Sequence, residues 1–344
     1  MLKSRMFTAA PLLVVIQLLL VGCVEQNNPE VNVYSARKEA LIKPALDRFT
    51  AETGIQVNLV TGNADALIQR LKAEGAASPA DVLITVDAGR LYRAKSLQLT
   101  QAVGNKILNN AIPESYRDPE NHWFGISLRT RPIMYAKDRV NPADLSTYEA
   151  LADEQWQGRV CIRSSSNIYN QSLVASMIAA DGAIAVEKWA AGLVKNFARK
   201  PVGGDRDQIR AVATGQCDVA IANTYYLFGM LQSADAVEMA TAEKIGVFWP
   251  NQQGRGTHVN ISGMAVTQAA KNTDHAIQLM EFMLQDETQT WYANTNGEFP
   301  IKFGIGIHPI QAAWGAFKKD AINLAELGQL SPVAMKIMDR VGWP

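Results

Sequence analysis

Between Val31 and Gly89 the chain alternates short apolar segments with amphipathic ones, and this alternation restricts the fold more than any other feature. The strand-like segments are 31–34, 56–60 and 80–85, and the helical patterns between them are 40–52 and 64–74. Strands that alternate with helices across short connections predict a parallel sheet covered by helices on both faces. Ligands in such sheets bind at the carboxyl ends of the strands. The 344 residues suffice for two lobes of ordinary domain size.

Two later segments share one local pattern. Val160–Asn170 and Cys217–Phe228 each run from an apolar strand through polar residues into a helix that begins with tyrosine. In a strand, the neighbours Tyr225 and Tyr226 would point to opposite faces, whereas at a helix start they lie about 100° apart and can converge. If the two strands are parallel neighbours, Tyr169 lies close to Tyr225. We therefore expect the three phenols to share one site.

The N-terminus has the pattern of an export signal. A basic start and an almost unbroken apolar run are followed by the sequence LVGC, which ends at Cys23. This ending is a bacterial lipobox, so we predict a signal peptide at 1–22, lipidation of Cys23 and a short tether at 23–30. An ordinary cleaved signal, with Cys23 incidental, is the alternative. No later apolar run reaches the ~20 residues of a membrane span, so we expect a periplasmic protein tethered by its lipid.

The remaining two cysteines are placed alike in the two segments, because Cys161 precedes Tyr169 by the same eight residues that separate Cys217 from Tyr225. Parallel neighbouring strands would bring these cysteines together. An even number of cysteines in an oxidising compartment predicts a disulfide between them. Two buried free thiols are the alternative.

Composition and motifs argue against nucleic-acid binding and against an enzyme. The 33 basic and 33 acidic residues balance, with no basic stripe interleaved with aromatic residues. The chain has no phosphate-binding loop, GxGxxG, GxSxG or HExxH motif. Asp87, at the carboxyl end of a predicted strand, is expected to cap the next helix. The histidines have no metal-binding spacing and are expected to be surface or structural residues: His122, His258, His275 and His308.

The second half of the chain predicts a return to the first lobe. The β-prone run 123–135 is long enough to cross between lobes, and 258–266 has the pattern of a return strand. Helical segments around 273–285 and 320–326 complete the chain. The predicted domains are an N-lobe of residues 31–130 and 257–303 and a C-lobe of residues 131–256 and 304–344.

The mature chain resembles, over nearly all its length, the ferric-iron-binding periplasmic proteins of ABC transporters. The matching stretches are VYSAR from Val33, SPADVLIT from Ser78, YNQS from Tyr169 and, most specifically, NTYY from Asn223. The resemblance implies an α/β, two-lobe periplasmic-binding-protein fold of type II. Each lobe is then a mixed, mostly parallel sheet with flanking helices, and two crossover strands join the lobes.

The resemblance also implies Tyr169, Tyr225 and Tyr226 as ligands of Fe(III). This ion is small and hard, so anionic oxygen donors suit it. A free phenol is neutral at pH 7, but coordination to a trivalent ion removes its proton. Three phenolates neutralise the metal and leave positions for an anion or water.

The first loop reads Arg37-Lys38-Glu39, where some family members supply histidine and tyrosine, or histidine with a glutamate from elsewhere. Members without these ligands use an arginine to hold a synergistic carbonate or bicarbonate, and the resemblance implies Arg37 for this role. Capping of a neighbouring helix is the alternative for Arg37. Arg129 is expected to complete the clamp, with Arg131 as a further candidate. Glu39 stays open as a direct ligand.

The prediction is therefore a monomeric, non-enzymatic solute-binding protein that captures ferric iron between its lobes and delivers it to an ABC permease in the inner membrane. The first alternative keeps the fold but binds another solute, such as an oxyanion, an organic acid or a polyamine. The tyrosine triad, which those solutes do not require, favours iron. A secreted hydrolase is a third hypothesis, for which the sequence offers no catalytic motif.

Overall fold

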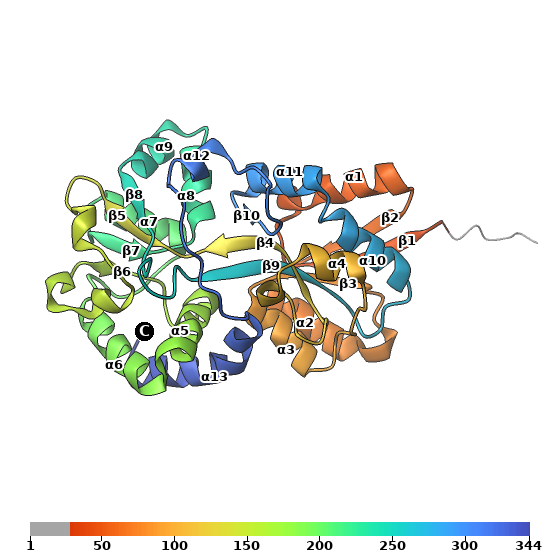
Figure 1. Ribbon diagram of the computed structural model, residues 1–344, viewed down its shortest axis with the longest axis horizontal. Coiled ribbons are helices and arrows are strands. Elements are labelled where there is room, and N and C mark those ends of the chain that lie inside the picture. Colours follow the sequence, from red (N-terminus) through yellow and green to blue (C-terminus); the bar gives the residue numbers. More distant parts are fainter. Residues whose placement is uncertain (1–27) are drawn as a thin grey trace, which may run out of the picture.

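The structure is a computed structural model that describes residues 28–344, arranged in two lobes that each contain one mixed β-sheet (Figure 1). The predicted signal peptide 1–22, the lipidation site Cys23 and the first part of the tether lie outside the described residues. Within residues 28–344, no helix combines the length and the apolar character needed to cross a bilayer. This architecture is the two-lobe α/β fold that the resemblance implies.

The first lobe is built on a six-stranded sheet with the order β10-β4-β9-β3-β1-β2. Its strands are β1 (Glu30–Ser35), β2 (Gln56–Thr61), β3 (Val82–Val86), β4 (Phe124–Thr130), β9 (Val259–Val266) and β10 (Phe299–Pro300). The helices around it are α1 (Lys43–Thr53), α2 (Ala64–Glu74), α3 (Ala88–Ser96), α4 (Lys106–Ala111), α10 (Thr273–Phe282) and α11 (Asp286–Asn296). β1 pairs in parallel with β2 and β3, as the predicted βαβαβ unit requires.

The second lobe is built on a four-stranded sheet with the order β6-β7-β5-β8. Its strands are β5 (Ile133–Ala136), β6 (Val160–Cys161), β7 (Val219–Ile221) and β8 (Ile245–Phe248). The remaining helices are α5 (Ile168–Asp181), α6 (Ala183–Lys195), α7 (Asp205–Ala213), α8 (Thr224–Leu231), α9 (Ala236–Glu243), α12 (Pro309–Ala312) and α13 (Ala325–Arg340). Short 3-10 helices are η1 (Glu39–Leu41), η2 (Gly75–Ala77), η3 (Glu114–Tyr116), η4 (Pro142–Asp144), η5 (Glu149–Ala152) and η6 (Glu154–Trp156).

Antiparallel pairs outnumber parallel ones in both sheets, so the expectation of mostly parallel sheets is wrong. In the first sheet β9 is antiparallel to β3 and β4, and β10 is antiparallel to β4. In the second sheet only β6 and β7 are parallel. The reason is the passage of the chain between lobes: β4 leaves the first lobe and β9 returns to it, so the two strands run in opposite directions side by side.

β4 and β9 lie together where the two lobes meet (Figure 1), and every residue of both strands is buried. The predicted crossover run 123–135 is interrupted, because β4 ends at Thr130 and β5 of the other sheet begins at Ile133. Pro132 lies in this gap, and a proline cannot donate a hydrogen bond to a sheet. Arg131 and Pro132 therefore form the turn from one lobe to the other.

The C-terminal helix differs from the prediction of a helix at 320–326. α13 instead runs from Ala325 to Arg340 and packs against α5 of the second lobe and α3 of the first. Gly328 allows the close approach to α3, because a Cβ atom there would lie 2.3 Å from the Tyr92 side chain. Pro332 lies inside this helix, and a proline in a sequence pattern normally indicates a helix end.

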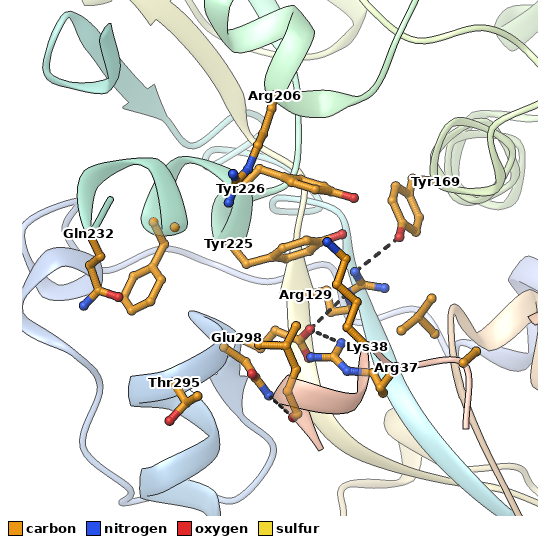
Figure 2. Close-up of a pocket in the computed structure, with 16 residues that line it drawn as sticks. Arg37, Lys38, Arg129, Tyr169, Arg206, Tyr225, Tyr226, Gln232, Thr295 and Glu298 are labelled. Atoms are coloured by element: carbon orange, nitrogen blue, oxygen red, sulfur yellow. Dashed lines mark hydrogen bonds and ion pairs between the residues drawn. The ribbon is translucent and has the colours of Figure 1, made fainter. Parts of the chain in front are cut away.

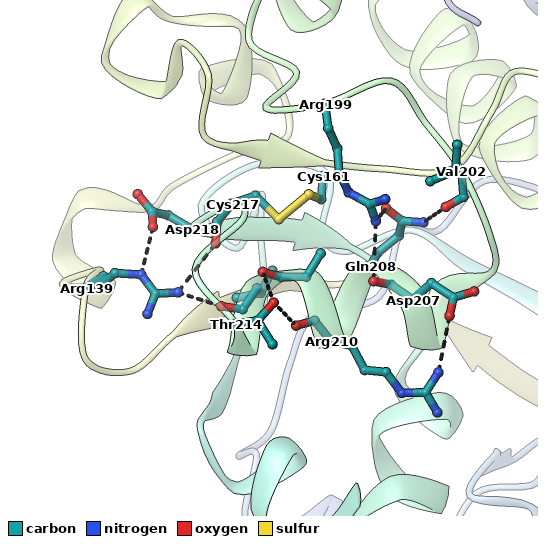
Figure 3. The surroundings of a disulfide bond; sticks show 12 residues. Arg139, Cys161, Arg199, Val202, Asp207, Gln208, Arg210, Thr214, Cys217 and Asp218 are labelled. Atoms are coloured by element: carbon teal, nitrogen blue, oxygen red, sulfur yellow. Dashed lines mark hydrogen bonds and ion pairs between the residues drawn. A yellow bond between two sulfur atoms is a disulfide. The ribbon is translucent and has the colours of Figure 1, made fainter.

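A disulfide joins Cys161, the last residue of β6, to Cys217, which lies just before β7 (Figure 3). The parallel register pairs Val160 with Val219 and brings the two cysteine Cα atoms to 5.9 Å, within the range that a disulfide requires. Both cysteines are buried. The bond thus links the two strands that lead towards the tyrosine-bearing helices α5 and α8.

Candidate metal centre

Both tyrosine-bearing helices begin beyond the carboxyl ends of paired strands, and asparagine side chains fix their starts. In α5, Asn170 Nδ2 donates hydrogen bonds to the carbonyl oxygens of Arg163 at 2.8 Å and Ser164 at 3.2 Å. In α8, Asn223 occupies the N-cap position but its side chain does not cap the helix. It instead donates to the hydroxyl oxygen of Tyr225 at 3.0 Å, which orients that phenol.

Arg131 connects the two helix starts from inside the protein. Its guanidinium donates to Asn170 Oδ1 at 2.7 Å and to Asn223 Oδ1 at 2.9 Å, and it forms an ion pair with Asp205 at 3.3 Å. Arg131 is buried and does not line the large cavity described below. The structure therefore places this candidate clamp behind the site, where it positions the two tyrosine-bearing turns.

The structure brings the three predicted tyrosines together (Figure 2). The rings of Tyr225 and Tyr226 have centroids 4.4 Å apart. The guanidinium carbon of Arg129 lies 4.4 Å from the Tyr225 ring centre and 5.0 Å from the Tyr169 ring centre. Arg129 Nη2 also donates to the Tyr169 hydroxyl oxygen at 3.3 Å. One buried cation therefore contacts phenols from two separate helices.

Arg37 and Arg129 are connected through the buried carboxylate of Glu298. Arg37 Nη1 lies 2.5 Å from Glu298 Oε1, and Arg129 Nε lies 3.5 Å from the same oxygen. The other carboxylate oxygen accepts hydrogen bonds from Ser127 and Ser262. The result is a continuous polar chain from the first loop of one lobe to a tyrosine of the other.

A cavity of about 530 Å³ opens onto these groups and is lined by both lobes. The first lobe contributes Arg37 and Lys38, and Glu39 is exposed and does not line the cavity. Within residues 28–344, no three His, Cys, Asp or Glu side chains gather as a metal site, so the phenols are the candidate donors. The lining residues are Ala36, Arg37, Lys38, Leu41, Val86, Arg129, Tyr169, Arg206, Tyr225, Tyr226, Phe228, Gly229, Gln232, Thr295, Asn296 and Glu298.

The three phenols differ in acidity. Burial raises the pKa of Tyr169, but the positive charge of Arg129 and hydrogen bonds from Tyr225 and Arg129 outweigh it, so this pKa lies below that of a free phenol. Burial and the neighbouring phenols raise the pKa of Tyr225 well above its usual value. Burial, with the charges of Tyr169 and Asp205, raises the pKa of Tyr226 to about 12. Tyr169 is thus the first of the three to ionise.

Glu298 is ionised despite its burial. Burial raises its pKa, but the charges of Arg37 and Arg129 and the hydrogen bond from Ser127 lower it below the usual value of a glutamate. In the same way, Glu298 and the phenols keep Arg129 firmly protonated, because they raise its pKa against the effect of burial.

Sequence reasoning missed Glu298 and Arg206. Glu298 follows Gly297, which ends α11 with a φ of 63°, and precedes the short strand β10. A lone acidic residue between a helix stop and an apolar strand was the only local signal. Its partner Arg37 is 261 positions away, so no local pattern indicates the pairing.

A two-lobe α/β fold with a polar cleft between the lobes is the architecture of a solute-binding protein. The profile described as bacterial extracellular solute-binding protein matches residues 45–317. The chain is 49% identical over 314 residues to "Iron uptake protein A1" of Synechocystis sp., a match that covers 91% of this chain and 87% of that protein.

Solved structures of ferric-iron-binding proteins are also similar to this chain. A Trichodesmium protein (FutA) in complex with iron and citrate matches with a TM-score of 0.90 and 48% identity, over 92% of this chain and all of the other (100%). A ferric binding protein from Campylobacter jejuni matches with a TM-score of 0.87 and 39% identity, over 91% of this chain and 100% of that chain. The chain belongs to the bacterial extracellular solute-binding protein family, among its ferric-iron-binding, non-enzymatic members. The predictions of the family and of a two-lobe α/β fold with mixed sheets are confirmed.

Proposed function

We propose that this protein binds ferric iron between its lobes through the phenolate oxygens of Tyr169, Tyr225 and Tyr226. The main support is the gathering of two phenol rings within 5.0 Å of the Arg129 guanidinium carbon, with the third ring packed on Tyr225. Hard anionic oxygen donors match the preference of a small trivalent ion. The relatives of similar length are named for iron uptake or ferric binding.

Binding is expected to begin at Tyr169, whose pKa is lowered. Tyr225 and Tyr226 have raised pKa values and keep their protons until the metal displaces them. Arg129 holds Tyr169 and Tyr225 in place, and its positive charge favours ionisation of Tyr169. Capture of iron therefore releases protons from the cleft.

An oxyanion is expected to complete the site. Four cationic side chains line the cavity, namely Arg37, Lys38, Arg129 and Arg206, against the single carboxylate of Glu298. Three phenolates neutralise Fe(III), so the excess positive charge of the cleft remains. We propose that Arg37 and Arg129 hold a carbonate or bicarbonate, because arginine forks match planar oxyanions. Glu39 is not required in this arrangement.

Closure of the lobes then buries the metal. A hinge motion is stabilised by a ligand that bridges both lobes, and here Arg37 comes from the first lobe and the phenols from the second. We propose that the lobes comprise residues 31–130 with 257–303 and 131–256 with 304–344. The loaded monomer would deliver iron to an ABC permease in the inner membrane, while a lipid on Cys23 tethers it in the periplasm.

The test of iron binding is the colour of the loaded protein. With ferric citrate and bicarbonate, wild-type protein should develop a broad phenolate-to-iron absorption band in the visible range. Tyr225→Phe combined with Tyr226→Phe should abolish the band, whereas Tyr135→Phe, which alters a phenol outside the cavity, should not. A band that persists in the double variant would place the site elsewhere. No band in wild-type protein would favour another anionic or organic solute.

The anion is tested separately. Arg37→Ala should weaken iron retention when bicarbonate is the only added anion. The Trichodesmium structure contains citrate, so the same titration with citrate and without bicarbonate distinguishes the two anions. Equal retention by wild type and Arg37→Ala under both conditions would remove Arg37 from the clamp.

A further inference from the structure

Asp87 caps α3 with a backbone conformation that capping does not require. Its φ and ψ are 79° and 122°, and its Oδ1 accepts from the Gly89 N–H at 2.9 Å. Positive φ is sparsely populated in residues other than glycine and persists only where the surroundings impose it. The other Asn and Asp caps with the same kind of side-chain bond have φ between −122° and −65°: Asn63, Asn105, Asn141 and Asp235. Capping alone therefore does not explain Asp87.

The Asp87 carboxylate also reaches the other lobe. Ser172 Oγ lies 2.7 Å from Asp87 Oδ1 and 2.8 Å from Oδ2, so the serine hydroxyl donates to the carboxylate. Asp87 N–H donates to the Ile261 carbonyl oxygen at 2.9 Å, which fixes Asp87 to β9 of the first sheet. Ser172 belongs to α5 of the second lobe. Both side chains are at most 2% exposed, so water does not compete for this bond.

This bond lies one helical turn from a proposed metal ligand. Tyr169 and Ser172 are three residues apart on α5, and residues at this spacing share a helix face. A Cβ atom on Gly89 would lie 3.8 Å from Ile168 and 3.9 Å from Ser172, so the first turns of α3 and α5 touch. Asp87, Arg129 and Tyr169 also line one small void between the lobes.

We propose that Asp87 and Ser172 are positioning residues for metal binding: their hydrogen bond across the lobes holds the first turn of α5 so that Tyr169 stays beside Arg129. The inference rests on the proposed function, because it requires Tyr169 to be a ligand. This role explains the unusual backbone conformation of Asp87, because its carboxylate must cap α3 and accept the hydrogen bond from Ser172 at the same time. Without the bond, the first turn of α5 is held towards the first lobe by the hydrogen bonds from Arg131 to Asn170 and from Arg129 to Tyr169, so Tyr169 is positioned less firmly.

The experiment compares Ser172→Ala with two matched variants. Ser176→Ala removes another buried hydroxyl of α5, one that bonds only within its own helix, to the Leu173 carbonyl oxygen. Ser172→Thr keeps the hydroxyl donor. Each protein is loaded with ferric iron and bicarbonate, and release to a competing chelator is followed by loss of the visible band. Hydrogen exchange of the first-turn amides of α5 is measured in the iron-free proteins.

Ser172→Ala should release iron about tenfold faster than wild type, the effect expected when a buried hydrogen bond worth roughly 1 kcal/mol is lost. It should also exchange the first-turn amides faster. Ser176→Ala should match wild type, and Ser172→Thr should restore release to within about threefold. Release and exchange in Ser172→Ala equal to those in Ser176→Ala would overturn the inference alone. Absence of the band in wild-type protein would overturn the proposed function and the inference together.

Discussion

Glu298→Gln is the substitution that most directly tests the charge balance of the cleft. It removes the negative charge shared by Arg37 and Arg129 while keeping the shape of the side chain. Because the pKa of Glu298 is below its usual value, the carboxylate is ionised at pH 7 and the substitution changes the charge fully. Arg37, Arg129 and Glu298 are all at least 94% buried, being no more than 6% exposed, so the change is poorly screened.

The substitution should destabilise the empty protein more than the anion-loaded protein. Removing one partner of a buried ion pair costs about 3–5 kcal/mol, because the remaining charge stays buried and unpaired. For a chain of this size that corresponds to a melting temperature roughly 4–7 °C lower. The two freed guanidinium groups should bind carbonate more tightly. An anion at about a hundred times its Kd stabilises the folded protein by about 2.7 kcal/mol, which offsets most of the stability lost through the substitution.

The assay is thermal unfolding by circular dichroism with and without bicarbonate, together with titration of the visible iron band. Glu287→Gln is the control, because Glu287 is exposed in the first turn of α11, at the opposite end of that helix from Glu298, and its loss should cost less than about 1 kcal/mol. Two results would contradict this account of how the carboxylate holds the two arginines. One is an equal melting temperature of Glu298→Gln and wild type, and the other is a rise in melting temperature on adding bicarbonate that is no larger in Glu298→Gln than in wild type.

Three further predictions concern acid, reduction and proton release. Burial, with the charges of Arg131 and Arg255, lowers the pKa of His258 to about 3, so this histidine is neutral in the folded protein. The stability that comes from keeping His258 neutral is present above pH 6.5 and is lost as the pH falls towards about 3. His258→Phe should therefore reduce the loss of unfolding free energy between pH 8 and pH 4 by about 3 kcal/mol. The Cys161–Cys217 disulfide joins residues 56 positions apart, so its reduction should lower the free energy of unfolding by about 4 kcal/mol. An unchanged denaturant midpoint in the presence of dithiothreitol would contradict this. Iron binding should release two to three protons from the phenols per metal at about pH 7, measured with a pH indicator in weak buffer; binding that is independent of pH would exclude phenolate ligands.

Much of the site followed from local sequence patterns. The tyrosines could be placed at helix starts because a polar cap after an apolar strand marks such a start in any fold. The shared spacing from Cys161 to Tyr169 and from Cys217 to Tyr225 could be read as two parallel neighbours. The structure pairs β6 with β7 in that direction.

Other parts of the site could not be predicted this way. Arg131 was expected to be a candidate anion clamp, yet in the fold it binds Asn170, Asn223 and Asp205. Asp87 was expected only to cap a helix, and the sequence gives no sign that its carboxylate meets Ser172. The hydrogen-bond partners of a buried guanidinium or carboxylate are the groups that pack around it, and packing brings together segments that are far apart in the chain.

The sequence by itself determined the βαβαβ unit of the first lobe, the helices that present the tyrosines and the cysteines placed to be joined. Each of these depends on hydrophobic periodicity, on capping residues or on spacing, which act over a few residues. Only the tertiary structure decided the direction of the crossover strands, the sharing of Glu298 by two arginines and the bond between Asp87 and Ser172. These features exist only once the two lobes are packed, because buried charges and polar groups must then find partners that are distant in sequence.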